Sequence, residues 1–152
     1  MAAAVGAVQA RSTIRLRRLP DIIDAGVIEE SPECREALAR MKKEYVAPAE
    51  ADVLWADAIV FGSSSRFSAS SAEWAEYLKL LARLQSGGKL DGKVGSVFMS
   101  DPQNRESAPA LSSFAATLLQ LGLVVVPPGF AGESVTLQGR RTATVAGALR
   151  TL

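Results

Sequence analysis

The residues of this chain that could do chemistry are concentrated in one serine-rich segment. The stretch VFGSSSRFSASSAEW places six serines in the nine positions 63–71, together with Arg66 and Phe67. Such a composition is typical either of a flexible linker or of a polar loop that holds a ligand. Because the segment connects an apolar strand directly to an amphipathic helix, we interpret it as a ligand-holding loop at the end of a strand.

The residue types that are missing exclude several kinds of chemistry. The chain contains no histidine and a single cysteine, Cys34. Histidine general bases, Ser-His-Asp triads and histidine metal ligands are therefore excluded, and neither a zinc site nor an internal disulfide is expected. We expect Cys34 to be an inert part of a helix, the alternative being a reactive thiol. We therefore expect any chemistry to be done by a bound cofactor, the alternative being that the chain does no chemistry.

Size and charge fit one soluble globular domain over residues 1–152. The chain is 48% hydrophobic and 22% charged, with a net charge of +1. This charge gives no global attraction to nucleic acid or to anionic membranes, and the apolar runs are far shorter than the ~20 residues that cross a bilayer. The N-terminus lacks the charge order of a secretory signal, and one cysteine suits a reducing compartment. We therefore predict a cytoplasmic protein with no nucleic-acid or membrane partner.

Apolar strands alternate with helices along the chain. The predicted helices cover residues 1–11, 34–45, 70–87, 110–121 and 134–152, and the predicted strands cover 13–20, 57–62, 94–99 and 123–126. Continuous apolar strands that alternate with helices indicate a parallel sheet covered on both faces. In such folds ligands bind outside the carboxyl ends of the strands, where the loops 63–71, 100–106 and 127–133 are expected to converge.

Three groups of residues have two interpretations each. Arg15 and Arg17 alternate with apolar residues, which indicates the exposed edge of a strand, the alternative being phosphate binding. Trp74 and Tyr77 belong to an apolar helical stripe with the spacing of a core face, the alternative being an interface. Trp55 is expected to serve packing.

Four segments together resemble one protein family. The stretches ADVLWADAIVFGSSSRFSASSAEWAEYLKLL, GKLDGKVGSVFMS, LGLVVVPPGF and LQGRRTATVAGAL follow one another in the chain. In this order they are similar to the flavodoxin-like NAD(P)H:quinone oxidoreductases of the tryptophan-repressor-binding-protein type. The resemblance extends from about Arg15 to the C-terminus.

The resemblance implies a fold, an activity and a set of site residues. It implies a flavodoxin-like, doubly wound parallel sheet of strand order 2-1-3-4-5 in three layers, with FMN at the switch point. It further implies a dimer or tetramer that passes a hydride from NAD(P)H to FMN and then two electrons to a quinone. No side chain is expected to be catalytic. The implied cofactor-binding residues are Ser63, Ser65, Arg66, Phe67 and Ser100.

The chain departs from the family pattern at several positions. Ser64 stands where proline is usual, the loop 100–106 contains no glycine, and Gln120 and Leu121 replace a histidine pair. These changes leave open a surface salt bridge for Arg66, ordinary packing for Phe67, and a flavin-free homologue that acts as a subunit or regulatory binding module.

The N-terminal part of the family pattern is the largest departure. Family members begin with a buried strand and a phosphate loop, and only then reach the helix that residues 1–11 match. We therefore expect the first, central strand to be missing from this chain. The simpler explanation is a start site assigned too late; the alternative is direct pairing of the second strand with the third, which gives the order 2-3-4-5.

Overall fold

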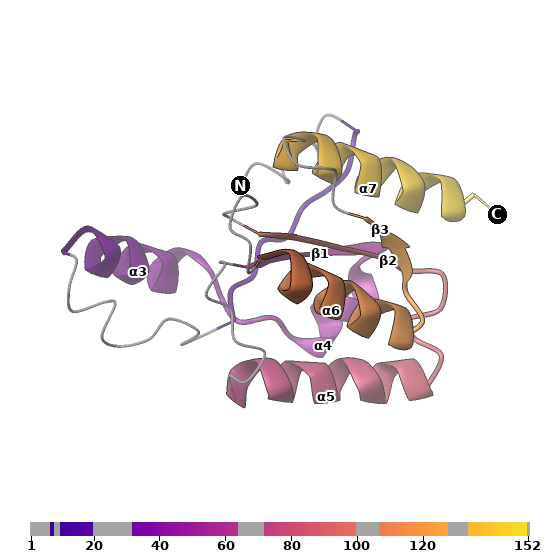
Figure 1. Ribbon diagram of the computed structural model, residues 1–152, viewed down its shortest axis with the longest axis horizontal. Coiled ribbons are helices and arrows are strands. Elements are labelled where there is room, and N and C mark those ends of the chain that lie inside the picture. The colour runs from indigo at the N-terminus through magenta and orange to yellow at the C-terminus, as the bar shows by residue number, and fades with distance from the viewer. Residues whose placement is uncertain are drawn as a thin grey trace.

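A parallel sheet forms the centre of the molecule. The computed structural model describes residues 7, 10–19, 32–63, 72–99, 107–127 and 134–151. Its elements are α3 (Pro32–Glu44), α4 (Glu50–Trp55), β1 (Ala58–Ser63), α5 (Ala72–Ser86), β2 (Val94–Met99), α6 (Ser107–Gln120), β3 (Val124–Val126) and α7 (Val135–Leu149). The three strands form one sheet of order β1-β2-β3 (Figure 1). The predicted α/β architecture with a parallel sheet is confirmed.

The register of the sheet follows from the apolar strands. β1 pairs in parallel with β2 from Ala58 opposite Val94 to Ser63 opposite Met99. β2 pairs with β3 over a shorter length, which ends at Ser96 opposite Val126. Because all three strands run the same way, their carboxyl ends meet at one edge of the sheet, here called the carboxyl edge.

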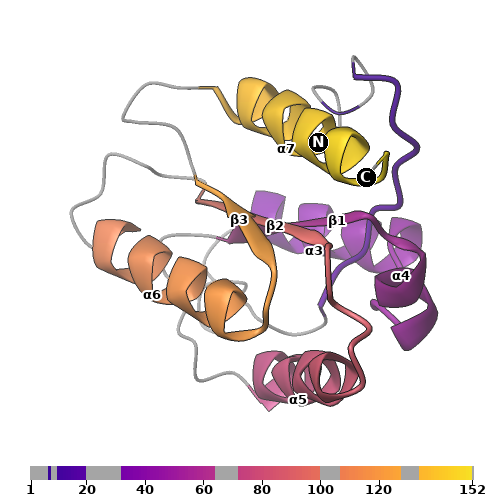
Figure 2. The same cartoon turned by 90° about the vertical axis from the view of Figure 1, so that its right-hand side faces the viewer.

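Helices cover the two faces of the sheet. α5 and α6 lie on one face and α7 lies on the other (Figures 1 and 2). Side chains alternate between these faces, as strand geometry requires. Val97 packs into the larger core with α5 and α6, whereas Val94 and Val126 pack with Ala146 of α7.

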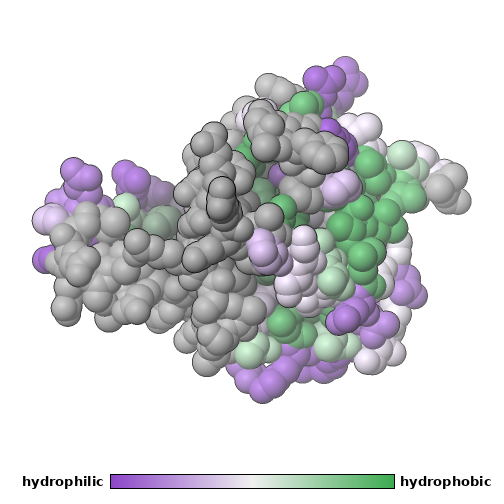
Figure 3. Space-filling model, viewed as in Figure 1, coloured by the Kyte–Doolittle hydropathy of each residue, from purple (hydrophilic) through white to green (hydrophobic). Residues whose placement is uncertain are grey.

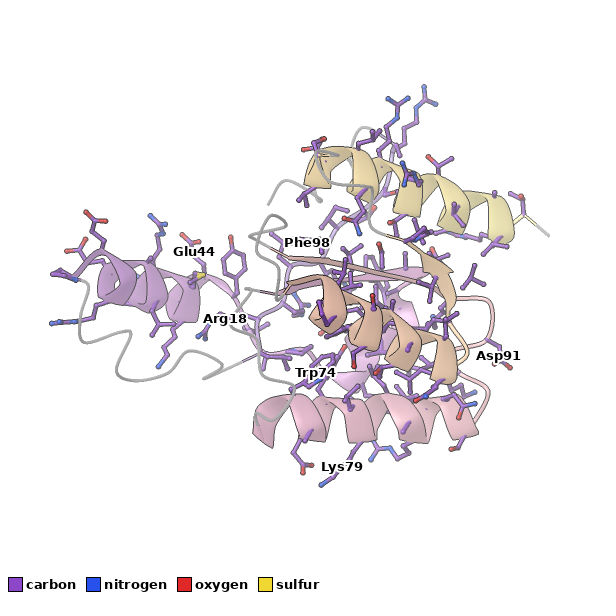
Figure 4. All side chains as sticks on the ribbon, in the orientation of Figure 1. Arg18, Glu44, Trp74, Lys79, Asp91 and Phe98 are labelled. Atoms are coloured by element: carbon purple, nitrogen blue, oxygen red, sulfur yellow. The ribbon has the colours of Figure 1, made fainter. Side chains whose placement is uncertain are left out.

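An aromatic cluster fills the core between β1, α5 and α6. Trp74 is only 3% exposed. The ring centroid of Phe61 lies 5.7 Å from that of Trp74 and 5.3 Å from that of Phe114, and Tyr77 borders the same group. The core interpretation of Trp74 and Tyr77 is therefore confirmed. Figure 4 shows Trp74 between α5 and the sheet.

Polar surfaces mark the outward sides of the helices. Figure 3 shows hydrophilic side chains along α3, which extends away from the sheet, and along the outer side of α5. α5 ends where predicted, since Gly88 has a φ of +68°, a conformation that glycine adopts without strain. Within the described residues, no helix is both long and apolar enough to cross a membrane.

The segment 13–19 differs from the prediction. It is not a strand; its one backbone hydrogen bond to another part of the described chain joins the amide of Arg18 to the carbonyl of Val46, at 3.1 Å. The predicted strand 13–20 is therefore wrong over its described part. Alternation of apolar and polar residues supplies an amphipathic segment, but a strand also needs a neighbouring ladder. Among the described residues β1 pairs with β2 alone, so the order 2-3-4-5 by direct pairing does not form.

The helix α4 is not among the helices predicted from the sequence. Its first turn contains Glu50 and Asp52, and the carboxylate of Asp52 accepts a hydrogen bond of 3.1 Å from the amide of Ala49. Acidic residues stabilise the first turn of a helix, because its amides have no partner within the helix. The predicted helix 1–11 lies almost entirely outside the described residues.

Candidate functional site

The carboxyl edge collects the ends of β1, β2 and β3. Ser63, Met99 and Val126 are the last residues of these strands. α5, α6 and α7 each follow one of the strands, and their N-terminal ends lie on the same side of the molecule (Figure 1). Helix N-termini present unpaired amides and partial positive charge, which favour a polar or anionic ligand.

The structure describes one of the five predicted site residues, Ser63, and only its backbone. The backbone of Ser63 belongs to β1 and lies opposite Met99 of β2. Ser65, Arg66, Phe67 and Ser100 lie outside the described residues, so their assignment as cofactor contacts stays a prediction. Because Ser100 directly follows Met99, the paired ends of β1 and β2 bring the starts of both predicted loops to one place.

A glycine and an aromatic ring meet close to that place. Gly62 is opposite Phe98 in the register. A Cβ atom at Gly62 would lie 2.5 Å from Cζ of Phe98, closer than such atoms approach in proteins. The missing side chain therefore lets the Phe98 ring lie across β1 near the carboxyl edge (Figure 4).

Buried polar side chains tie α7 to the sheet near the same edge. Nε2 of Gln138 donates hydrogen bonds of 2.7 Å to Oγ of Ser96 and 2.7 Å to the carbonyl oxygen of Val97. Oγ of Ser96 donates in turn to the carbonyl oxygen of Val126, at 2.9 Å. Gln138 is 3% exposed and Ser96 is fully buried. We call these two side chains and their hydrogen bonds the Gln138–Ser96 bridge.

The start of α7 is also capped. Oγ of Ser134 accepts a hydrogen bond of 3.2 Å from the amide of Leu137. The first turns of α6 and α7 contain no acidic residue. The first turns of α6 and α7 therefore carry no carboxylate that would repel an anion.

The N-terminal arginines Arg15 and Arg17 lie elsewhere and already have partners. Nε and NH2 of Arg17 each lie 2.7 Å from an oxygen of the Asp52 carboxylate, and the guanidinium of Arg15 lies 4.1 Å from the ring centroid of Trp55. The hydrogen bond from Arg17 is the main reason that the pKa of Asp52 falls to about 2. α4 leads into the amino end of β1, so this cluster lies away from the carboxyl edge. Phosphate binding by these arginines is thus disfavoured. Trp55 is 42% exposed, so it lies at the surface against Arg15 and not in the core.

Sequence reasoning did not single out the Gln138–Ser96 bridge. Gln138 enters the prediction only as part of the LQGRR stretch, one of the segments that carry the family resemblance. A signal was present, because Gln138 and Thr142 are spaced i, i+4 and so share one face of the last helix with the apolar Val145. Polar residues on an otherwise apolar helical face need buried partners, and Ser96 in an apolar strand is one.

Metal chemistry finds no support in the described part of the chain. Within those residues no group of three or more histidine, cysteine, aspartate or glutamate side chains could hold a metal ion.

Comparison with curated proteins decides the family. A protein named NAD(P)H dehydrogenase (quinone) from Archaeoglobus fulgidus is 31% identical over 131 residues, which cover 84% of this chain and 68% of that protein. The chain belongs to the NAD(P)H dehydrogenase (quinone) family. A protein of the same name from Methylocella silvestris is 32% identical over 137 residues, covering 87% of this chain and 65% of the relative.

Further similarity supports the same family. NAD(P)H dehydrogenase (quinone) 3 from Rhizobium meliloti is 33% identical over 135 residues, covering 87% of this chain and 61% of that protein. The chain thus spans about two thirds of the length of the curated relatives that it matches. No family model matches it. The resemblance to flavodoxin-like quinone oxidoreductases is confirmed at the level of the family and the α/β fold.

Proposed function

We propose that this protein is an NAD(P)H:quinone oxidoreductase that uses FMN. The observation that carries the proposal is the similarity of 31% to 33% to three proteins named NAD(P)H dehydrogenase (quinone), over more than four fifths of this chain. The parallel sheet supports it, since ligands of such sheets bind at the carboxyl ends of the strands.

The described residues fit a planar anionic cofactor in two respects. Gly62 lets the ring of Phe98 lie against the backbone of β1 at the carboxyl edge, which puts an aromatic side chain where a planar ring system would bind. The first turns of α6 and α7 offer amide donors and carry no acidic residue. When bound, FMN would accept a hydride from the nicotinamide and deliver two electrons to the quinone.

The chain itself would supply binding and orientation. We assign Ser63, Ser65, Arg66, Phe67 and Ser100 as the contacts that hold the cofactor, through hydroxyl and backbone donors and one cation. Histidine is absent from the chain, and none of these assigned residues has to transfer a proton for a hydride to move between bound rings. The same proposal includes a cytoplasmic dimer or tetramer with NAD(P)H and a quinone as its small-molecule partners.

The test is retention of flavin by the purified protein. The protein is mixed with excess FMN, passed through gel filtration, and its visible absorbance spectrum is recorded. We expect flavin bands to stay with the protein and NAD(P)H to be oxidised when a quinone is added. Arg66→Ala should weaken FMN binding about tenfold, the effect of losing one charge-assisted hydrogen bond.

The matched control is Arg83→Ala. Arg83 is an exposed arginine of α5 that pairs with Glu50 at 2.7 Å, and its loss should leave FMN binding unchanged. If no flavin stays with the protein and no quinone is reduced, the proposal fails, and a flavin-free subunit or regulatory binding module becomes the better description.

A further inference from the structure

The two ladders of the sheet end at different places. β3 pairs with β2 only as far as Ser96 opposite Val126, while β2 continues to Met99 with β1 as its neighbour. Residues 97–99 of β2 therefore have no strand pairing on the β3 side within the described sheet. This is the point at which β2 and β3 separate at the carboxyl edge.

The Gln138–Ser96 bridge occupies this point. Gln138 donates to the carbonyl oxygen of Val97, the first residue of β2 beyond the ladder, and Ser96 donates to the carbonyl oxygen of Val126, the last residue of β3. Side chains thus continue the hydrogen bonding of the sheet one step past the end of its backbone ladder. The donors come from α7 and from β2 itself, so three elements are joined at one buried spot.

Packing alone does not require this arrangement. An apolar side chain of similar volume would fill the space under α7, and replacing a buried hydrogen-bonded pair by apolar groups is often nearly neutral for stability. A buried amide differs because its hydrogen bonds fix direction and distance, here to the hydroxyl oxygen of Ser96 and the carbonyl oxygen of Val97 on β2. The hydroxyl of Ser96 extends the connection to the carbonyl oxygen of Val126 on β3. The contribution of Gln138 is therefore to fix the position of α7 relative to the sheet, more than to add stability.

Thr142 provides the contrast on the same helix. It is 1% exposed and lies one turn beyond Gln138, but its hydroxyl donates to the carbonyl oxygen of Gln138 within α7, at 2.9 Å. Its hydrogen bond therefore makes no connection to the sheet. Gln138 and Thr142 are thus both buried polar residues of α7, but of these two only Gln138 hydrogen-bonds to the sheet.

We propose that Gln138 is a positioning residue that sets the spacing of the carboxyl ends of β2 and β3 and the start of α7, and thereby the fit of FMN at the carboxyl edge. The part that concerns FMN rests on the proposed function. The part that concerns the strands does not.

The experiment compares Gln138→Met with Thr142→Val in the full chain. Hydrogen exchange of the amides in residues 97–99 and 134–138 reports the bridge without any cofactor, and an FMN titration reports the site. We expect Gln138→Met to speed exchange of these amides about tenfold and to raise the dissociation constant of FMN about tenfold. Thr142→Val should change neither the exchange of these amides nor the dissociation constant of FMN. This should hold even where Thr142→Val lowers the thermal unfolding midpoint as much as Gln138→Met does.

Ser96→Ala tests the same bridge with a smaller change in the core. It should reproduce both effects, and the double variant Ser96→Ala/Gln138→Met should be no weaker in FMN binding than Gln138→Met alone, because both changes break one unit. If Gln138→Met does not fold, the comparison of Ser96→Ala with Thr142→Val takes its place.

The outcomes separate the two levels of inference. Equal effects of Gln138→Met and Thr142→Val on exchange and on FMN binding would overturn the positioning role and leave Gln138 as core packing. If the wild-type protein binds no FMN, the proposed function fails and the cofactor part of the inference fails with it. In that case faster exchange confined to the bridge variants would still support the positioning of the strands, and its absence would overturn that too.

Discussion

Arg17 and Asp52 form a two-point ion pair that fastens the N-terminal segment to α4. Nε and NH2 of Arg17 each lie 2.7 Å from one oxygen of the carboxylate. Asp52 also accepts a hydrogen bond from the amide of Ala49, so one carboxylate serves both the start of α4 and the attachment of residues 13–19. Paired arginine–carboxylate geometry of this kind is stronger and more directional than a single contact.

Acid should release this attachment before it unfolds the sheet. The hydrogen bond from Arg17, followed by that from the Ala49 amide, lowers the pKa of Asp52 from 3.8 to about 2. A carboxylate with a depressed pKa contributes stability that is complete above pH 3.8 and is lost as the pH falls towards about 2. Asp52→Asn should therefore remove the pH dependence of amide exchange in residues 13–19 over this interval.

Glu76→Gln is the control for that experiment. Glu76 pairs with Lys79 on the outer side of α5, where both side chains are at least 70% exposed. Exposed ion pairs of this kind contribute little to stability. Glu76→Gln should therefore leave the pH dependence of amide exchange in residues 13–19 as it is in the wild type. Unchanged acid behaviour in Asp52→Asn would contradict the assigned role.

Alkaline pH should destabilise the protein through Tyr77. Burial in the aromatic cluster, and to a smaller extent the charge of Asp52, raise the pKa of Tyr77 from 10.0 to about 12. The unfolded chain releases this proton first, so the contribution to stability is complete below pH 10.0 and is lost as the pH rises towards about 12. Denaturant unfolding at a series of pH values should show this loss in the wild type and a smaller slope in Tyr77→Phe. Parallel slopes in the two proteins would show that Tyr77 is not the group responsible.

Gly62→Ala should strain the pairing of β1 and β2. The added Cβ would meet the ring of Phe98 at 2.5 Å, so either the ring or the strand has to move. Overpacking of this kind costs about 1–3 kcal/mol in the free energy of unfolding, which denaturant titration would measure. The double variant Gly62→Ala/Phe98→Leu should recover much of the loss, because leucine vacates the ring position. Gly147→Ala is a suitable control, since a Cβ there meets nothing within 4 Å.

Local patterns in the sequence predict most of the sheet and its helices. The apolar strands 57–62, 94–99 and 123–126 correspond closely to β1, β2 and β3. Their continuous β-branched and apolar runs are enough to predict a strand without knowledge of its neighbours, because both faces of such strands are buried. The end of α5 at the Gly87-Gly88 pair is equally local, since it depends on one backbone conformation.

Elements that depend on distant partners could not be predicted in this way. The segment 13–19 alternates like a strand, yet its place is decided by Asp52 and by Val46, which belong to other parts of the chain. The Gln138–Ser96 bridge joins residues separated by 42 positions, so the spacing of Gln138 and Thr142 indicates a buried polar face on the last helix but does not reveal that Ser96 is the partner. The site residues Ser65, Arg66, Phe67 and Ser100 came from family resemblance and stay predictions.

The order of the strands has a consequence for how the chain folds. β1, β2 and β3 neighbour one another in sequence as well as in space, so each ladder closes a loop of modest length. α7 is different among the described elements, because it reaches back to the beginning of the sheet; Arg150 and Asp57, paired at 3.3 Å, are 93 positions apart. We expect the sheet with α5 and α6 to assemble in the folding transition state and α7 to dock afterwards. Substitutions on the sheet side of α7 would then mainly accelerate unfolding and leave the folding rate almost unaltered, which makes this helix the part that governs the lifetime of the native state.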